Sequence, residues 1–491
     1  EHHLSHAASA FYPSPFKEAA VLTIDGVGEW ATTTIGYAKD NEIKIIRELH
    51  FPHSLGLLYS AFTYYTGFRV NSGEYKLMGL APYGNPDSEE TKSFKELILN
   101  ELADLREDGS LLLNMKYFNF ATGLRMTNNK KWTKLFGFPP RTEEMPISQN
   151  YMNMALAIQQ VTEEIMIKLA ETAKKLTNSE NLVMAGGVAL NSVGNGKLLK
   201  TGLFKDIWIQ PAAGDAGGAL GAAYLGWYLW KGEKRTKIDT PDSMKGAFLG
   251  PEFSEKEIKG VIRKYKASYN YYDSFEELIK FTASKINEGN VVGWYQGRME
   301  YGPRALGNRS ILGDARNPDM QKKMNLKIKY REGFRPFAPT VLEEDINEYF
   351  DINCPSPYML HVIPVLDKRL VSLPENFNQL ELYKRLYTLR SDVPAITHID
   401  NSARIQSVSR TTNFKYWSLI NEFKKQTGYG VIVNTSFNVR GEPIVCTPDD
   451  AFRCFMRTEM DYLVLGNFIF DKKMQKNLEN DSNWKEEFKL D

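Results

Sequence analysis

The sequence has few cysteines and lacks any long hydrophobic run. Only three cysteines occur among its 491 residues, Cys354, Cys446 and Cys454. They are too few and too widely spaced for a disulfide framework or a four-thiolate zinc site, so we expect ordinary buried thiols in a reducing, cytoplasmic protein. No stretch reaches the roughly 18 consecutive apolar residues that a membrane-spanning helix needs. We therefore expect no membrane span.

The chain also lacks a net charge. Its 61 basic and 60 acidic residues leave a formal charge of +1, which provides no overall field to attract nucleic acid or anionic lipid. We therefore expect no nucleic-acid partner, and recognition of an anion must be local. The first residues, from Glu1 onward, have neither the basic nor the apolar region of a signal peptide. We expect the chain to begin within a domain.

Local patterns in the first half of the chain predict an α/β fold. Residues 20–49 alternate short β-type runs with turns, which predicts a strand meander. Helical periodicity over residues 151–176 predicts a long amphipathic helix. Buried-type strands at 182–184 and 207–210 are each followed by a glycine turn.

The length of the chain fits two or three domains. A polar, turn-rich segment at residues 233–256 separates the first pattern of elements from a new one. We place the domain boundary near residue 240, which gives a first domain at 1–240 and a second at 241–491.

Two histidines and two aspartates form a candidate metal site. His2 and His6 are four residues apart on a stretch that can be helical, so both imidazoles would lie on one face and His3 would point elsewhere. Asp25 ends a predicted strand, and Asp215 stands in a similar place after the strand at 207–210. This ligand set suits iron, manganese or zinc. The alternative is that the histidine pair is an ordinary surface or core feature.

Glycine turns in the first domain form a candidate nucleotide site. Glycine lets phosphate oxygens approach the backbone, and a following helix presents free N–H groups. The alternative is that such glycines only permit close packing of a helix on a strand. The residues concerned lie in the strings DGVGEW, AGGVALN and GDAGGALG: Gly26, Gly28, Gly186, Gly187, Asn191, Gly217 and Gly218.

Basic residues concentrate in the second domain. Residues 298–335 contain six arginines and four lysines against four acids. Proline and glycine are interleaved with the arginines, which indicates a shaped loop whose guanidinium groups are set for bidentate contacts with phosphate or carboxylate. A small anionic substrate is the favoured ligand, and a solvated charged face is the alternative. The basic residues of interest are Arg298, Arg304, Lys329, Arg331 and Arg335.

A polar strand end follows later in the second domain. The string VIVNTSFNVRGEPIV places Asn434, Thr435, Ser436 and Asn438 after a β-branched strand. An earlier string, THIDNSARIQSV, adds Arg404. A Ser436–His398–Asp400 triad is conceivable, but no nucleophile-elbow pattern supports it.

Several strings in this order resemble the O-carbamoyltransferases of the nodulation-protein and antibiotic-tailoring type. The most specific are HHLSHAASAFYPSPF, TIDGVGEW, SGEYKLMGLAPYG, GGVALN, GDAGGALGAA, GRMEYGPRALGNRSI, KYREGFRPFAP and NTSFNVRGEPIV. The resemblance implies a first domain similar to the actin-like ATPase (ASKHA) fold of tRNA threonylcarbamoyltransferases. It implies a second, α/β domain similar to YrdC, which makes carbamoyl adenylates.

The resemblance also implies a reaction and its residues. The second domain would convert carbamoyl phosphate and ATP, with Mg²⁺, into carbamoyl adenylate, and the first would pass the carbamoyl group to a small-molecule hydroxyl. Iron is the metal of the family, and a homodimer is one expected assembly. The implied metal ligands are His2, His6, Asp25 and Asp215. The residues that match the family's positions for carbamoyl phosphate and the nucleotide phosphates are Arg298, Lys329, Arg335, Arg404 and Ser436. We expect the catalytic residues to be His2, His6, Asp25, Arg298, Lys329 and Arg335. At the nucleotide we further expect Arg304, Arg331, Arg404, Asn434, Thr435, Ser436 and Asn438.

One departure from the family pattern leaves alternatives open. Members of the family carry a segment ahead of the HHLSHA string, so we expect a truncated chain, a second polypeptide that completes the sheet, or no final transfer. A tRNA threonylcarbamoyl-type transferase and a non-catalytic binder of nucleotide or carbamoyl phosphate are the rival functions. Residues 86–150 are expected to form an insertion that faces the acceptor. They hold many polar and aromatic positions, the aromatic ones being Tyr117, Phe118, Phe120, Trp132 and Phe136.

Overall fold

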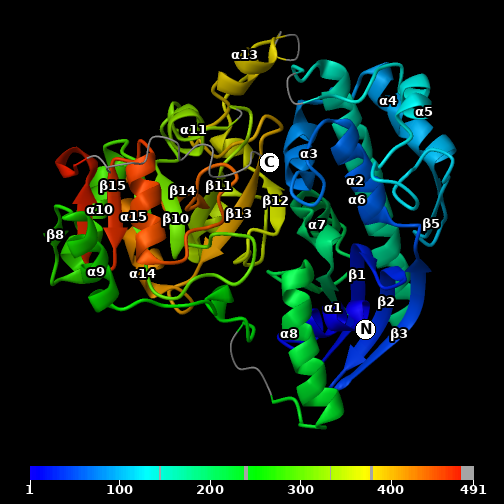
Figure 1. Cartoon of the computed structure of the whole chain (residues 1–491), viewed down its shortest axis with the longest axis horizontal. Helices are drawn as coiled ribbons and strands as arrows, with labels where there is room; N and C mark the ends of the chain where they lie inside the picture. The colour runs from blue at the N-terminus through cyan, green and yellow to red at the C-terminus, as the bar shows by residue number, and fades with distance from the viewer. Residues whose placement is uncertain (143–144, 237–240, 332, 376, 378–379, 477–491) are drawn as a thin grey trace. The chain divides into compact units, whose positions relative to one another are not determined.

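A computed structural model describes residues 1–142, 145–236, 241–331, 333–375, 377 and 380–476 (Figure 1). The chain divides into two compact units, which we call unit 1 (Glu1–Ser243 with Leu360–Val362) and unit 2 (Met244–Met359 with Ile363–Asp491). Both contain helices and an open sheet, so the predicted α/β class is confirmed.

Unit 1 is built on a five-stranded sheet in the order β3-β2-β1-β6-β7. β1 (Glu18–Gly28), β2 (Ala31–Lys39) and β3 (Glu42–His50) pair antiparallel, which confirms the predicted strand meander. β6 (Asn181–Ala185) and β7 (Asp206–Ile209) extend the sheet from β1 with parallel pairing. Because β6 and β7 run parallel to β1, the turns at their carboxyl ends meet at one edge of the sheet.

The longest helix of unit 1 is α6 (Gln149–Thr177), which confirms the amphipathic helix predicted over 151–176. Its buried residues recur at helical spacing, and it ends at Asn178 in a left-handed conformation, as helices often do. The other helices and strands of this unit are α1 (His2–Phe11), α2 (Leu55–Tyr65), α3 (Glu74–Leu80), η1 (Ala81–Tyr83), α4 (Glu89–Leu97), η2 (Ile98–Leu102), β4 (Ala103–Leu105), β5 (Leu111–Leu113), α5 (Asn129–Phe136), η3 (Gly187–Leu190), α7 (Ser192–Lys200), α8 (Asp215–Leu225) and η4 (Gly226–Trp230).

Four of the five aromatic residues singled out in the segment 86–150 are buried in unit 1. Trp132 is fully buried, and its ring contacts those of Phe118 and Phe136. Tyr117 is also buried, and Phe120 is half-buried against Phe118. Aromatic composition alone does not separate a small core from a binding surface, so an acceptor-facing role for residues 86–150 stays a prediction.

Unit 2 contains a nine-stranded sheet in the order β12-β13-β11-β14-β10-β9-β15-β16-β8. Its strands are β8 (Asn270–Tyr271), β9 (Val292–Tyr295), β10 (Arg309–Gly313), β11 (Ala338–Leu342), β12 (His361–Pro364), β13 (Ser402–Val408), β14 (Val431–Ser436), β15 (Tyr462–Leu465) and β16 (Phe468–Asp471). Its helices are η5 (Lys245–Ala247), α9 (Glu255–Tyr265), α10 (Phe275–Asn287), α11 (Met320–Met324), η6 (Asn325–Lys329), η7 (Glu343–Asp345), α12 (Ile346–Tyr349), η8 (Asp367–Arg369), α13 (Leu382–Tyr387), α14 (Phe414–Thr427), α15 (Pro448–Arg457) and η10 (Lys472–Met474).

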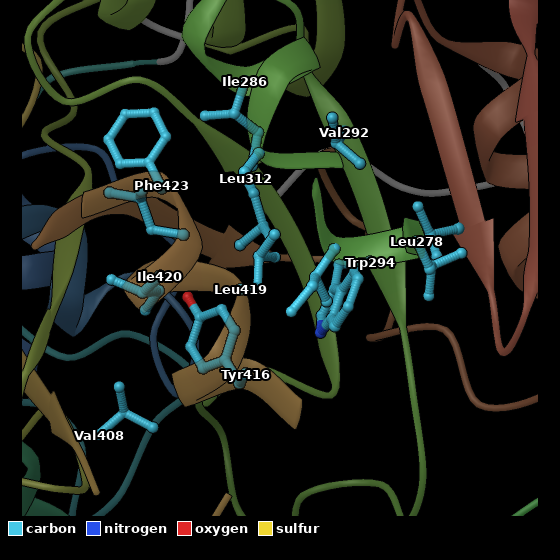
Figure 2. Packing of buried hydrophobic residues seen from close by; sticks show 14 of the residues in the cluster. Leu278, Ile286, Val292, Trp294, Leu312, Val408, Tyr416, Leu419, Ile420 and Phe423 are labelled. Atoms are coloured by element: carbon cyan, nitrogen blue, oxygen red, sulfur yellow. The ribbon is translucent and has the colours of Figure 1, made fainter. Parts of the chain in front are cut away.

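The hydrophobic core of unit 2 lies where α10 and α14 meet the sheet (Figure 2). Leu278 of α10 and Phe423 of α14 contribute to it together with Trp294 of β9. Tyr416 of α14 is fully buried, and its ring lies against the backbone of Gly307, where a β-carbon would come within 2.1 Å of it. The loop before β10 is therefore packed directly on the core.

Among the described residues, no helix is both long and apolar enough to cross a membrane. Cys454 is buried as expected, whereas Cys354 and Cys446 are half-buried.

Candidate functional site

α1 brings His2 and His6 to one point at the edge of the unit 1 sheet. Their Nε2 atoms lie 3.0 Å apart, and both face Asp25 of β1, at 2.9 Å and 3.3 Å from its Oδ2. Asp215, the first residue of α8, lies 3.7 Å from each of these nitrogens through its Oδ1. The four residues predicted from the sequence as metal ligands therefore converge, with one ligand atom from each within 4.8 Å of the others.

Asp25 is the most constrained member of this cluster. Burial opposes its ionisation, but hydrogen bonds with His6 and His2 and from the Gly187 N–H hold the pKa of Asp25 well below its usual range. The side chain of Asp25 is 12% exposed and that of Asp215 is 82% exposed. The cluster therefore opens to solvent at Asp215.

The donor atoms fit a divalent metal of borderline character. Two imidazole nitrogens and two carboxylates aimed at one point form a ligand set typical of iron, manganese or zinc. The third histidine of α1 is turned away, as expected: Nε2 of His3 lies 3.0 Å from the Ala31 carbonyl, and its Nδ1 lies 2.6 Å from the Thr23 hydroxyl. Burial lowers the pKa of His3 to about 4, so it is a neutral, structural side chain.

Both helices that carry ligands are anchored by close backbone contacts. Arg235 donates from its guanidinium to four carbonyls at and beyond the end of α1, those of Phe11, Tyr12, Ser14 and Phe16. These bonds satisfy carbonyls that a helix end leaves without partners. On α8, a β-carbon at Gly221 would lie 1.8 Å from the Ser5 carbonyl of α1. Only glycine lets the two helices approach so closely.

Two of the predicted phosphate-binding glycines are required for packing. A β-carbon at Gly28 would lie 1.9 Å from the ring of His2, so this glycine makes room for a candidate ligand. Gly186 has a φ of +91°, and a β-carbon there would lie 2.3 Å from the Ile24 carbonyl of β1. Both positions match the alternative raised from the sequence, that glycine permits close packing. A nucleotide at these turns stays a prediction.

The remaining glycines differ in how much space surrounds them. A β-carbon at Gly217 would lie 2.2 Å from the Ala212 carbonyl. At Gly26 the nearest atom would be 4.0 Å away, and at Gly218 nothing would lie within 4 Å. Gly26 and Gly218 therefore have room for a ligand, and Gly217 does not.

Asn191 belongs to a buried amide network that the sequence did not indicate. Its Oδ1 accepts from the Gly194 N–H and from Gln159 of α6, and its Nδ2 donates back to Gln159 Oε1 at 3.1 Å. Gln159 in turn donates to Glu163 at 3.0 Å, and Glu163 pairs with Lys197. The network fixes the turn whose Gly187 N–H binds Asp25.

Four arginines of unit 2 lie close together. Burial lowers the pKa of Arg404 well below its usual range, and the neighbouring charges of Arg304, Arg331 and Arg335 add to this effect. Like charges held together in a partly buried place form a site suited to a polyanion.

Lys329 lies at the strand end predicted from the sequence. Its Nζ donates to the carbonyl oxygens of Ser436 and Asn438 at 2.5 and 2.9 Å, and it also reaches the Ser436 hydroxyl and Asn438 Oδ1 at 3.2 and 2.7 Å. Burial, together with Arg331, lowers its pKa. Lys329 therefore shapes the loop at 436–438, and a direct contact with phosphate stays a prediction.

Three other predicted residues contact the protein itself. Arg298 is exposed and donates to the Leu249 carbonyl at 3.0 Å. Asn434 is buried and donates to Gln406, Thr340 and Ala305. Thr435, on β14, is half-buried and pairs with Ile311 of β10.

Some charges counted in the basic segment are structural. Arg309 is fully buried, and its guanidinium donates to four backbone carbonyls: those of Gln296, Asn308, Pro251 and Gly297. Arg316 forms a paired contact with Asp314.

The conceivable triad does not assemble. Ser436 bonds to Lys329 and Asn438, whereas the Asp400 carboxylate accepts from Ser402 at 2.6 Å, and the imidazole of His398 lies 3.4 Å from that same hydroxyl. The nucleophile and the base of the triad are thus engaged with other partners.

Fold and site together define an α/β protein of two units, one with a His–Asp cluster of metal-ligand type and one with an arginine cluster. Family models match both parts of the chain. Residues 1–224 match the carbamoyltransferase N-terminus, and residues 283–472 match the carbamoyltransferase C-terminus.

Curated relatives agree with these matches. The chain is 57% identical to an uncharacterized protein of Synechocystis sp., across 100% of this chain and 79% of the relative. It is 35% identical to nodulation protein NolNO of Sinorhizobium fredii, across 96% of this chain and 63% of that protein. It is 30% identical to a 3'-hydroxymethylcephem-O-carbamoyltransferase of Streptomyces clavuligerus, across 62% and 52% of the two chains.

The chain belongs to the carbamoyltransferase family and is a carbamoyltransferase. The resemblance drawn from the sequence strings is thereby confirmed. The chain spans part of the length of each of these relatives.

Proposed function

We propose that this chain is an O-carbamoyltransferase that activates carbamoyl phosphate with ATP and passes the carbamoyl group to the hydroxyl of a small molecule. Activation is assigned to residues 241–491, as a YrdC-like domain, and transfer to residues 1–240, as an actin-like domain. One observation carries the proposal: a polyanion-type arginine cluster lies in unit 2, and metal-type ligands converge in unit 1. The named cephem relative supports a small hydroxyl acceptor.

The first half-reaction needs cations around two phosphate compounds. Water cleaves carbamoyl phosphate into carbamate and phosphate, and a carbamate oxygen then attacks the α-phosphorus of ATP. Carbamoyl adenylate forms, and pyrophosphate leaves. Arg304, Arg331, Arg335 and Arg404 would offset the repulsion between carbamate and triphosphate and hold the two in line. The reaction gives the carbamoyl group a good leaving group, AMP.

The second half-reaction joins the carbamoyl group to an acceptor oxygen. The hydroxyl attacks the carbamoyl carbon, the bond to AMP breaks, and the hydroxyl proton is released. His2, His6, Asp25 and Asp215 would hold a divalent metal, iron in the family, which when bound supplies a Lewis acid for the carbamoyl oxygen or the hydroxyl. Asp25 is suited to this role because its neighbours keep it ionised.

Two variants of the full chain separate the half-reactions. We expect Arg404→Gln to reduce ATP-dependent pyrophosphate release at least 100-fold and to abolish transfer. His6→Ala should retain pyrophosphate release and lose transfer of radiolabelled carbamoyl to a panel of sugar and nodulation-factor hydroxyls. The matched controls are Arg263→Gln, at an exposed position of α9, and His50→Ala, at an exposed position of β3.

The same assays can contradict the proposal. If the parent chain binds ATP but releases no pyrophosphate with carbamoyl phosphate, it is a binder and not an enzyme of this type. If His6→Ala abolishes both half-reactions, the assignment of the two steps to separate sites is wrong.

A further inference from the structure

The loop that carries Arg304 is held by a buried carboxylate. We define the Arg304 loop as residues 300–309, ahead of and into β10. Oε1 of Glu300 accepts from the backbone N–H groups of Leu306, Asn308 and Arg309, at 2.7, 2.8 and 3.3 Å. Glu300 is only 5% exposed. A carboxylate that binds three N–H groups fixes the path of the loop, because charge-assisted hydrogen bonds are strong where water is excluded.

A second buried side chain, Gln406 of β13, ties this loop to the sheet. Its Nε2 donates to the Leu306 carbonyl at 2.8 Å. Its Oε1 accepts from the Thr340 hydroxyl of β11 at 2.6 Å and from Asn434 Nδ2 of β14 at 2.9 Å. Gln406 thus joins three strands and the loop, and it is the single amide that all of these bonds share.

Gln406 lies two residues after Arg404 on the same strand. Side chains alternate between the faces of a strand, so Arg404 and Gln406 lie on one face of β13. One strand therefore supplies both an arginine of the cluster and the amide that binds the loop of another arginine, Arg304. Gln406 is 3% exposed, and Thr340 and Asn434 are buried with it.

We propose that Gln406 is a positioning residue for anion binding, which holds the Arg304 loop so that Arg304 stays beside Arg404 before a phosphate ligand arrives. The inference rests on the proposed function, because it assumes that the cluster binds phosphate compounds. Leu306 lies two residues after Arg304, so the hydrogen bond from Gln406 to the Leu306 carbonyl restrains the part of the loop that carries Arg304. The ligand then meets a site that is already formed.

The chemistry of glutamine suits this position. The Leu306 carbonyl needs a donor, whereas Thr340 and Asn434 both need an acceptor. An amide side chain offers both, while a carboxylate would face the Leu306 carbonyl with a second acceptor. Methionine has a similar length and shape but can satisfy none of the three partners.

A double-mutant cycle on the full chain tests the inference, with ATP as the probe and its Kd measured by titration calorimetry. We expect Gln406→Met to weaken ATP binding about tenfold. Arg304→Gln should weaken it by at least as much. If Gln406 acts through Arg304, the double variant should bind ATP within about twofold of Arg304→Gln, because the positioned group is already lost. Effects that multiply in the double variant would overturn the inference.

Two further variants keep the test decisive. Thr340→Val retains the branched shape and removes the hydroxyl that donates to Gln406 and accepts from Asn434, so it should weaken ATP binding about two- to threefold, and only when Arg304 is present. This variant replaces Gln406→Met in the cycle if the latter does not fold. Gln426→Met, at an exposed position of α14, is the matched control and should leave the Kd unchanged.

The outcome distinguishes this inference from the proposed function. If the parent chain binds neither ATP nor carbamoyl phosphate, the proposed function fails, and the inference fails with it. If the parent binds ATP and the two losses multiply, only the positioning role of Gln406 is wrong.

Discussion

His398 shows how the arginine cluster acts on a single side chain. Burial lowers the pKa of this histidine to about 4, against the attraction of Asp400 and with the repulsion of Arg404 and Arg390. Arg390 cannot move to relieve the repulsion, because it donates to backbone carbonyls that include those of His398 and Thr397. His398 is therefore neutral at pH 7 beside a concentrated positive charge.

The free energy of unfolding should depend on the protonation of His398. Its ordinary pKa of 6.5 falls to about 4 in the folded chain, so between these values the unfolded state binds more protons. Stability is then present above pH 6.5 and is lost as the pH falls toward 4, by at most about 3 kcal/mol from this residue. Urea unfolding of His398→Gln should show a weaker loss of stability between about pH 7 and about pH 4.5 than the parent.

His50→Gln serves as the matched control, because it replaces a histidine at an exposed position of β3 by the same residue. Carboxylates titrate in the same pH range. The effect of His398 is therefore read from the difference in the free energy of unfolding between variant and parent at each pH. An identical pH dependence in parent and His398→Gln would show that the imidazole is not held neutral by the fold.

At the residue scale the sequence predicted which histidines and aspartates converge, but not which side chains support them. The spacing of His2 and His6 implies one helix face, and the structure brings them together. Asn191 and Asn434 are polar residues after strands, which suggested contact with a ligand. Their amides bind Gln159 and Gln406, 32 and 28 residues away. Pairing between such distant residues has no local signal, so their role toward a ligand stays a prediction.

Residues 25–28 at the end of β1, together with the two residues that lead into β2, form a segment that we call the β1–β2 turn. This segment carries Asp25, and its Gly28 lies against the ring of His2. Arg235 fixes the other end of α1. Turn and helix thus confine His2 from two sides, which matches the precision that metal ligands require.

We predict that Gly28→Ala weakens metal binding by at least tenfold. The added β-carbon would lie 1.9 Å from the His2 ring, so the ring or the turn must shift away from Asp25. Titration calorimetry of the full chain with Mn²⁺ measures the change directly. Gly26→Ala in the same turn is the matched control, because the nearest atom to its β-carbon would be 4.0 Å away. Equal losses in both variants would show that the turn, and not the position of His2, limits binding.

Elements with strong local periodicity were predicted closely, whereas their pairing was not. The helix expected at 151–176 is Gln149–Thr177, and the strand expected at 182–184 is Asn181–Ala185. In unit 2, β9 pairs in parallel with β15, and in this register Tyr295 lies opposite Leu465. Such a register joins distant parts of the chain and depends on tertiary packing, which no periodic pattern records.

At the scale of the whole molecule, the near-zero net charge does not reveal that the two candidate sites lie in different units. The arginine cluster lies in unit 2, and the His–Asp cluster lies in unit 1. Each unit has its own sheet and buried residues. The net charge of the chain therefore did not exclude anionic substrates. Because the two clusters lie in different units, a metal ion and an anionic ligand should each stabilise a different unit.

Calorimetric unfolding of the full chain should accordingly show two transitions with different ligand responses. A ligand present at 100 times its Kd stabilises the unit that binds it by about 2.7 kcal/mol, which for a unit of this size raises its Tm by roughly 5–10 °C. We expect Mn²⁺ to shift one transition and ATP with Mg²⁺ the other. His6→Ala should abolish only the Mn²⁺ shift, and Arg404→Gln only the ATP shift. A single transition that both ligands raise, and that either variant makes unresponsive to both, would show that the two sites do not belong to separate folding units.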